Sequence, residues 1–479
     1  MTYLIAIDNG SQSTKVSVID ERGQVHASAR RRLRPYDTSV PGRVVHPGDD
    51  LWDSIRATCQ EAMSRFAGRP EEIAGVGLCT IRFCRVLLDE AGELTEPVLS
   101  WMDPRVSAPH VRTDPRTRWV TTSSGYITHR LTGRFVDASA NYQGVWPIDQ
   151  VTASWSSDPG AYAVTGMPRE MLMDLAAPGD LLGHLTREAA EATGVPAGLP
   201  VFATANDKAV EALGSGLRSA DTVLLSLGTY IASMTAGSAA AAAQGAYWSN
   251  FASTPGDYLY ESGGIRRGMW TVSWYRSLID GDHREEPVPV DSLTEDQLNA
   301  GAAAVPAGSN GLMTVLDWLA PGEAPHRRGA ILGFDGTQGR YHVYRSILEG
   351  IALTMVNHTR TMEQALGRQF SAVVVAGGGS QSDLMMQIVA DVFDLPACRT
   401  SMRDAAGLGA AICAAVGSGV HRDFDTAVDA MVTVADVFDP VSGQVAAYRR
   451  INDVYSKLST YTDPLFRWTT GNIGHLVAV

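Results

Sequence analysis

The chain has 479 residues, of which 45% are hydrophobic and 19% are charged. A single hydrophobic core stops growing at roughly 250–300 residues, so we expect more than one domain. The formal net charge of −13 disfavours nucleic acid and anionic membranes as partners. It does not exclude a nucleotide, because local backbone N–H groups and Mg²⁺ can hold phosphates.

The N-terminus and the cysteines indicate a cytoplasmic protein. An apolar strand begins almost at the first residue, without the basic and apolar segments of a signal peptide. No apolar stretch approaches the length of a membrane span. The five cysteines form no Cys-x-x-Cys pair, which indicates reduced and mostly buried thiols.

The first half of the chain is predicted to alternate strands and helices. A Pro- and Gly-rich break precedes the last strand of this half, and we place the domain boundary after the following helix, giving domains 1–217 and 218–479. The predicted elements are a hairpin over 3–20, a helix starting at Asp49 or Asp50, strands over 73–79, 86–89 and 201–205, and a helix over 206–216.

The second half repeats this order, which favours an α/β architecture. An alanine run over 239–243 is interpreted as a loop or a helix turn without function. The predicted elements are a hairpin from about Thr222, a helix over 341–366, a buried strand over 372–376, a helix over 383–393 and a small-residue helix over 407–417.

Two segments share one sequence pattern. Each has an apolar strand, a glycine followed by a hydroxyl residue, and a second strand. Gly10-Ser11 and Gly228-Thr229 begin 218 positions apart, at positions 10 and 228, which predicts two related halves. A turn that exposes N–H groups and a hydroxyl can hold phosphate. The alternative for each is an ordinary polar hairpin turn, and neither has the Walker A spacing.

Two charged residues flank the first turn. Asp8 ends the strand before it, where a carboxylate can hold Mg²⁺ directly or through water. Lys15 follows the turn and can reach a phosphate. The first turn is therefore a candidate site for both a metal ion and a phosphate.

Asp207 follows the strand predicted over 201–205. A carboxylate at a strand end can accept the proton of a hydroxyl that attacks a phosphoryl group. The alternative is an aspartate that caps the next helix, which is the commoner use of such a residue.

Three consecutive glycines, Gly377, Gly378 and Gly379, follow a buried strand and precede a helix. They let the backbone approach a base or a ribose, although each can also serve a tight turn. Their spacing differs from G-x-G-x-x-G, which disfavours dinucleotide binding.

Candidate substrate groups lie between the first strands. Arg82 can hydrogen-bond sugar hydroxyls or form a structural salt bridge, and Trp101 can stack on a sugar or fill the core. Asp103 and Arg105 follow in the Trp101-Met-Asp-Pro-Arg105 segment.

Taken in order, these motifs resemble the FGGY family of carbohydrate kinases over nearly the whole chain. Single motifs are weak, whereas the ordered set is specific. The motifs are Asp8-Asn-Gly-Ser-Gln-Ser-Thr-Lys15, Trp101-Met-Asp-Pro-Arg105, Tyr126-Ile-Thr-His-Arg-Leu-Thr-Gly133, Asn206-Asp-Lys208, Gly214-Ser-Gly216, Leu227-Gly-Thr229, Gly322-Glu-Ala-Pro325, Arg328-Gly329, Tyr344-Arg-Ser-Ile-Leu-Glu-Gly350 and Gly377-Gly-Gly-Ser-Gln-Ser382 through Gln387.

The resemblance implies the sugar kinase/Hsp70/actin fold, with two RNase-H-like domains and an interdomain cleft. It implies phosphorylation of a sugar or polyol hydroxyl by ATP and Mg²⁺, and a possible homodimer. Asp207 falls at the catalytic base and, with Asp8, at the metal. The implied ATP residues are Gly10, Ser11, Gln12, Ser13, Lys15, Gly228, Thr229, Gly377, Gly378, Gly379, Ser382 and Gln387, and the implied substrate residues are Arg82, Phe83, Trp101, Asp103 and Asp207.

The chain departs from the family pattern at two places. Arg105 and Leu131 are 26 positions apart, where members usually have several dozen residues that help to wall the sugar pocket. In addition, Arg82-Phe83 stands where xylulokinase-like members have Met-His and glycerol-kinase-like members have Arg-Glu. The identity of the sugar is therefore left open by the sequence.

Our hypothesis from the sequence is a sugar kinase acting on a pentulose such as xylulose, or else on a tetrose or polyol. The alternative from another class is a nucleotide or sugar sensor without catalysis, but a sensor need not retain Asp207. A dinucleotide oxidoreductase ranks third because of the glycine spacing.

Overall fold

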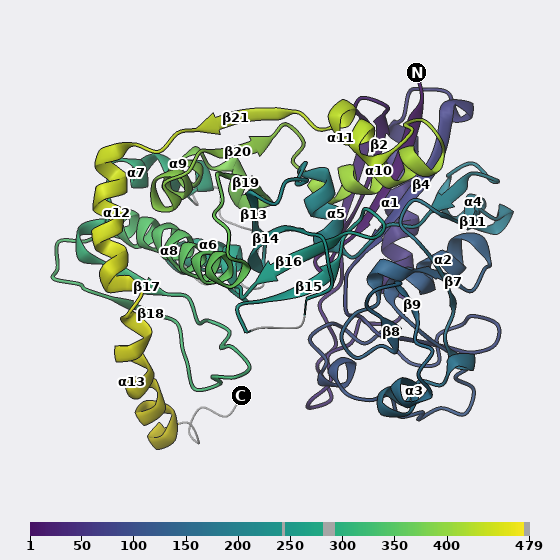
Figure 1. Cartoon of the computed structure of the whole chain (residues 1–479), viewed down its shortest axis with the longest axis horizontal. Coiled ribbons are helices and arrows are strands. Elements are labelled where there is room, and N and C mark those ends of the chain that lie inside the picture. Colours follow the sequence, from purple (N-terminus) through teal and green to yellow (C-terminus); the bar gives the residue numbers. More distant parts are fainter. Residues whose placement is uncertain (242–244, 281–292, 474–479) are drawn as a thin grey trace.

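The computed structural model describes residues 1–241, 245–280 and 293–473. Figure 1 shows two groups of strands with helices around them, one in the purple to blue first part of the chain and one in the teal to green part. In the described residues, no helix is long and apolar enough to cross a membrane. The five cysteines are free thiols, four of them buried, as predicted.

The first large sheet has six strands in the order β11-β12-β4-β1-β2-β3. Its strands are β1 (Tyr3–Asn9), β2 (Ser13–Asp20), β3 (Val25–Arg32), β4 (Ile73–Thr80), β11 (Leu181–His184) and β12 (Pro200–Phe202). The helices of this half are α1 (Asp50–Arg65), α2 (Ser123–Thr132), α3 (Pro159–Thr165), α4 (Arg187–Thr193) and α5 (Asp207–Gly214). Short strands complete it, namely β5 (Val86–Leu88), β6 (Trp119–Thr121), β7 (Val136–Ala138), β8 (Ile148–Asp149), β9 (Ser154–Trp155) and β10 (Asp174–Ala176).

The second large sheet has seven strands in the order β15-β16-β14-β13-β19-β20-β21. Its strands are β13 (Thr222–Leu227), β14 (Ile231–Gly237), β15 (Tyr247–Phe251), β16 (Tyr258–Ser262), β19 (Ala372–Ala376), β20 (Ala397–Thr400) and β21 (Val434–Phe438), and β17 (Met313–Val315) pairs separately with β18 (Ala330–Leu332). The helices are α6 (Gly268–Ile279), α7 (Glu295–Ala303), α8 (Arg340–Leu366), α9 (Asp383–Phe393), α10 (Ala405–Gly417), α11 (Phe424–Met431), α12 (Ser442–Tyr455) and α13 (Leu458–Ile473).

The two sheets share six strands in the same order and with the same relative directions. In β3-β2-β1-β4-β12-β11, two antiparallel pairings are followed by two parallel ones and a last antiparallel one. The strands β16-β14-β13-β19-β20-β21 repeat this pattern. The prediction of two related α/β halves is therefore confirmed, and β15 is an addition at the edge of the second sheet.

Helix α10 joins the two halves because it packs against β4 and α5 of the first. A Cβ added at Gly77 in β4 would lie 2.0 Å from the carbonyl oxygen of Ala410, and one at Gly409 would lie 2.0 Å from that of Val210. Only glycine permits such close backbone contact. The small residues predicted over 407–417 are thus explained by close packing between the halves.

Three predicted elements are shorter in the structure, among them the helix predicted over 206–216, which spans Asp207–Gly214. The strand predicted over 201–205 ends at Phe202, since the following residues leave the ladder and Thr204 donates its hydroxyl to Leu78 O. The strand predicted over 86–89 ends at Leu88. Part of the alanine run over 239–243 lies outside the described residues.

Candidate active site

The two predicted phosphate turns contact each other. Gln12, in the turn between β1 and β2, donates from Nε2 to Oγ1 of Thr229, in the turn between β13 and β14, at 2.9 Å. The first turn is closed by a hydrogen bond of 3.1 Å from Gly10 N to Ser13 O. Residues 217 positions apart therefore meet at one place between the halves.

The second turn is held by the beginning of α6. The N–H groups of Gly268 and Met269 donate to Thr229 O and Gly228 O at 2.7 and 3.1 Å. Because these carbonyls are already bonded on the far side of the turn, its geometry is fixed before any ligand binds.

The triple glycine lies against the strand that leads into the second turn. Gly377 has a φ of +84°, and a Cβ added there would lie 2.6 Å from Leu227 O. A Cβ added at Gly379 would lie 2.8 Å from the Leu227 Cβ, whereas Gly378 faces open space. The structure thus brings the predicted adenosine segment to the second phosphate turn.

The other two predicted adenosine residues make structural contacts. Ser382 caps α9 by accepting from Met385 N at 3.2 Å and donates to Asn299 Oδ1 at 3.0 Å. Gln387 donates from Nε2 to Asp391 Oδ1 and to the backbone carbonyl of Asp439, each at 3.0 Å. The amide donors of Gln387 therefore point away from the glycine segment.

Asp8 belongs to a buried charge cluster. Lys15 Nζ lies 3.2 Å from Asp8 Oδ2 and 2.8 Å from Asp404 Oδ1. Burial and the charge of Asp404 raise the pKa of Asp8 to about 7, although Lys15 opposes this. The cluster therefore has one positive charge for two carboxylates. The Lys15 ammonium group is already paired with Asp8 and Asp404.

Sequence reasoning missed Asp404, which lies just before α10 and 389 positions from Lys15. In the described part of the chain, no group of three or more His, Cys, Asp or Glu side chains forms a ready metal site. Mg²⁺ in phosphoryl-transfer sites is usually held by one or two carboxylates together with substrate phosphates, so Asp8 with Asp404 suits that mode.

Asp207 is the first residue of α5, but it is not the helix cap. The cap is Asn206, whose Oδ1 accepts from the N–H groups of Lys208 and Ala209, both at 3.1 Å. The interpretation of Asp207 as the capping residue is therefore wrong, because the neighbouring amide already satisfies the free N–H groups. Burial raises the pKa of Asp207, and the Arg82 guanidinium lowers it.

Arg82 forms the main ion pair between the halves. Its Nη1 and Nη2 lie 2.7 and 2.8 Å from the two carboxylate oxygens of Glu261 in β16, and its Nε lies 3.6 Å from Asp207 Oδ1. Glu261 is fully buried and also accepts from Asn250 at 3.0 Å. Of the two interpretations of Arg82, the structure shows the salt bridge.

Sequence reasoning also missed Glu261. It is a lone acid in the otherwise uncharged strand Tyr258–Ser262, and a buried charge needs a partner. The sequence therefore indicates that Glu261 needs a partner. It does not indicate that the partner is Arg82, which lies 179 positions away.

Phe83 has a positive φ of +63°, which is uncommon for a bulky residue. The Arg82 guanidinium carbon lies 5.0 Å from the centre of its ring. The strained backbone and this cation–π contact together hold Arg82 where it reaches both Asp207 and Glu261.

Of the remaining predicted substrate residues, Asp103 is hydrogen-bonded within the protein and Trp101 is partly exposed to solvent. The Asp103 side chain is fully buried and accepts from Val44 N and from Nε and Nη2 of Arg105, at 2.8–2.9 Å. Trp101 is half-buried against the core of the first half. The stretch 108–118, which lies in the shortened segment after Arg105, contains neither helix nor strand.

Family models match most of the chain, up to residue 418. The model described as "FGGY family of carbohydrate kinases, N-terminal domain" matches residues 3–113 and 109–214, and that of the C-terminal domain matches 223–418. The two N-terminal segments meet in the stretch after Arg105, where the sequence is short.

Similar proteins are sugar kinases. The chain is 46% identical to "Uncharacterized sugar kinase YgcE" of Escherichia coli, covering 97% of this chain and 95% of that protein. It is 24% identical to the xylulose kinase of Bacillus subtilis, covering 97% and 98%. Its fold matches the crystal structure of gluconate kinase from Lactobacillus acidophilus with a TM-score of 0.82 and 19% identity, covering 96% of this chain and 98% of that one. It also matches the crystal structure of xylulose kinase from Rhodospirillum rubrum with a TM-score of 0.79 and 24% identity, covering 97% of this chain and 100% of that one.

The lengths of the two alignments with these relatives differ. The Escherichia coli alignment has 466 positions for 97% of this 479-residue chain, so it contains almost no insertions relative to this chain. The Bacillus subtilis alignment has 506 positions for the same 97%, so about 40 positions of that protein have no counterpart. The resemblance and the predicted fold are confirmed: the chain is an ATP-using carbohydrate kinase and belongs to the FGGY family.

Proposed function

We propose that the kinase holds the ATP phosphates between the Gly10–Ser13 and Gly228–Thr229 turns and uses Asp207 as the base for a sugar or polyol hydroxyl. The observation that carries this proposal is the Gln12–Thr229 contact, which joins both turns at one place. Asp207 lies within electrostatic reach of Asp8, since its charge adds to the rise in the pKa of Asp8.

The residues fit Mg²⁺ at Asp8. The buried Asp8 and the partly exposed Asp404 share one lysine, so a divalent cation would supply the missing positive charge. When bound, Mg²⁺ would neutralise charge that develops on the phosphate oxygens. Asp8 and Asp404 would hold the ion directly or through water, and Lys15 would remain beside them.

Asp207 acts on the acceptor. Its carboxylate takes the proton of the hydroxyl while that oxygen forms the new bond to the γ-phosphorus, and the bond to the leaving ADP oxygen breaks in line. The Arg82 guanidinium opposes the effect of burial and helps to keep Asp207 ionised before the transfer. Arg82 is thus a positioning residue for Asp207, and Glu261 fixes Arg82.

The proposed acceptor is a pentulose such as xylulose, followed by a tetrose or polyol. Xylulose kinases among the relatives support the general class, but at 24% identity or less. The proposal also includes a cytoplasmic location, a homodimer, and no nucleic-acid or membrane partner.

The test is ADP release from ATP and Mg²⁺ across a panel of ketoses, aldoses and polyols. We expect at least one sugar to raise ADP release well above the sugar-free rate, with a phosphorylated product detected by mass spectrometry. If ATP binds but no sugar raises turnover, the proposed acceptors are wrong and the sensor alternative is favoured.

A further inference from the structure

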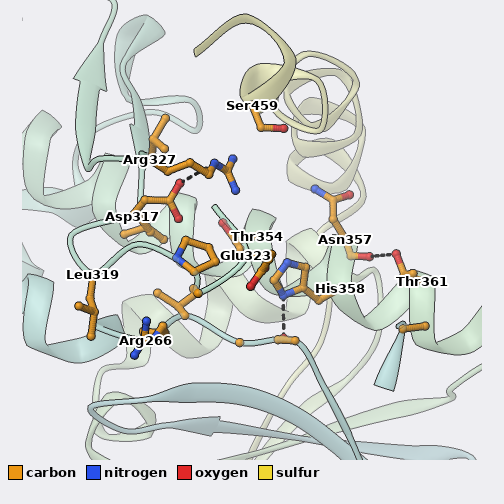
Figure 2. A pocket seen from close by; sticks show the side chains of 18 of the residues that line it. Arg266, Asp317, Leu319, Glu323, Arg327, Thr354, Asn357, His358, Thr361 and Ser459 are labelled. Carbon is orange, nitrogen blue, oxygen red and sulfur yellow. Dashed lines mark hydrogen bonds and ion pairs between the residues drawn. The ribbon is translucent and has the colours of Figure 1, made fainter. Parts of the chain in front are cut away.

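A cavity lies in the C-terminal half, beside the second phosphate turn. Its volume is about 770 Å³, within the range of roughly 300–1,000 Å³ that is common for small-molecule sites. None of the predicted ATP, metal or substrate residues lines it. Figure 2 shows Ser459, from α13, and Arg266, from the segment before α6, on opposite sides of the cavity.

Charges in the cavity wall are balanced. Among the described residues that line it, the carboxylates of Asp317 and Glu323 face the guanidinium groups of Arg266 and Arg327. Asp317 and Arg327 form an ion pair at 3.2 Å (Figure 2). Arg266 donates to Ala320 O at 2.7 Å, and Glu323 has no hydrogen bond or ion pair with the described residues. A ligand with a large net charge would therefore gain little here.

Single donors and acceptors complete the wall. His358 Nδ1 lies 2.7 Å from Gly263 O, and because a carbonyl can only accept, Nδ1 carries the hydrogen (Figure 2). Burial lowers the pKa of His358, so the ring is neutral and Nε2 is an acceptor. Tyr230 and Trp248 add aromatic surface.

This chemistry suits a neutral polyhydroxylated molecule. Each of its hydroxyls both donates and accepts, which matches carboxylates, guanidinium groups and a neutral imidazole in one wall. Its C–H faces pack well on aromatic rings.

The cavity wall is bonded to the second phosphate turn. Ile265 and Ile231 exchange both backbone hydrogen bonds, at 2.9 and 3.0 Å. A Cβ added at Gly264 would lie 2.6 Å from the Tyr230 hydroxyl oxygen, so this wall packs directly on the residue after Thr229. A ligand that contacts Tyr230 and the 263–266 segment therefore contacts the supports of the turn.

We propose that this cavity is an effector site for a neutral sugar or polyol, and that its occupant changes the nucleotide affinity of the Gly228–Thr229 turn. The effect on nucleotide rests on the proposed function, whereas the binding of the sugar does not. The site is separate from the acceptor cleft, and the phosphate turn connects the two.

The first experiment measures binding of neutral pentoses, hexoses and alditols to the full chain by saturation-transfer NMR. Ser459→Trp fills the cavity from α13, and Thr460→Trp is the matched control, since Thr460 is exposed and does not line the cavity. We expect at least one sugar whose signal is lost in Ser459→Trp and kept in Thr460→Trp. Signals that survive in both belong to the acceptor cleft.

A variant of unchanged volume guards against a folding defect in Ser459→Trp. Glu323→Gln removes a charged acceptor that is worth about 1.5 kcal/mol, so the affinity for the same sugar should fall about tenfold. Equal binding in both tryptophan variants, or no binding by any sugar in the panel, overturns the site. Binding of gluconate or an amino acid in place of neutral sugars overturns the ligand class.

The second experiment measures the Kd of a non-hydrolysable ATP analogue by calorimetry, with and without that sugar. We expect a change of about fivefold or more, which is the usual lower end of coupling between sites, and no change in Ser459→Trp. An unchanged Kd overturns the effector role. If the analogue does not bind at all, the proposed function fails, while the NMR result still decides the site.

Discussion

The ion pair between Arg82 and Glu261 gives the sharpest test of how the halves are joined. Glu261 accepts three N–H groups, two from Arg82 and one from Asn250. Glu261→Gln keeps the volume, but turns one acceptor into a donor that faces another donor. It also leaves the buried Arg82 charge with Asp207, at 3.6 Å, as its remaining partner.

Removing one member of a buried pair usually costs about 3–5 kcal/mol. Because the glutamine retains part of the hydrogen bonding, we expect a loss of about 2–3 kcal/mol in the free energy of unfolding. Turnover should fall as well, since Arg82 then pairs with Asp207 alone and holds it more firmly as an ion partner.

The assay is a double-mutant cycle of Glu261→Gln with Arg82→Met, followed by urea unfolding. We expect a coupling energy of about 2 kcal/mol, so that the double variant is less destabilised than the two single effects added together. A coupling energy below about 0.5 kcal/mol is the level expected for independent sites, and it would refute the account. Glu323→Gln is the control because Glu323 makes no ion pair with the described residues.

Four further predictions follow from the site. Asn206→Ala removes the α5 cap and should cost about 1 kcal/mol in urea unfolding, and no cost would contradict the assignment of the cap. Gln12→Ala breaks the contact with Thr229 and should raise the KM for ATP severalfold while leaving the urea midpoint nearly unchanged; an unaltered KM argues against the paired turns. Gly377→Ala forces a side chain into a positive φ and against Leu227 O, so the Kd of an ATP analogue should rise at least tenfold, and wild-type binding would show that close approach is not needed. Because burial raises the pKa of Asp207 and the base must be ionised, kcat/KM should fall with decreasing pH from above the usual aspartate range, and an acid limb at an ordinary carboxyl pKa would contradict this environment.

Local patterns allowed the paired turns to be predicted, because each copy is complete within about 18 residues of sequence. The strand over 372–376 and the helix over 383–393 were predicted with the bounds that the structure has, since apolar runs and a serine cap mark their ends. The small-residue helix was also predicted, but its role in joining the halves depends on tertiary contact with Gly77.

The missed residues act across long separations. Asp404 and Glu261 meet their partners 389 and 179 positions away, and no local period carries that information. Aspartate is common at the cap position of a helix, so the sequence allows Asp207 as the cap. In the structure the adjacent Asn206 accepts from the N–H groups of Lys208 and Ala209 instead. The phosphate role of Lys15 stays a prediction, whereas its ion pair with Asp404 could not be foreseen from local sequence.

The central claim is that Asp207 is the base of an ATP-dependent transfer to a sugar hydroxyl. The most direct measurement compares single-turnover phosphorylation of the best sugar by the wild type and by Asp207→Asn, with the Kd of an ATP analogue measured on both proteins. We predict a rate lower by about 10²–10⁴-fold with an almost unchanged Kd. A rate within about threefold of the wild type would contradict the role of Asp207.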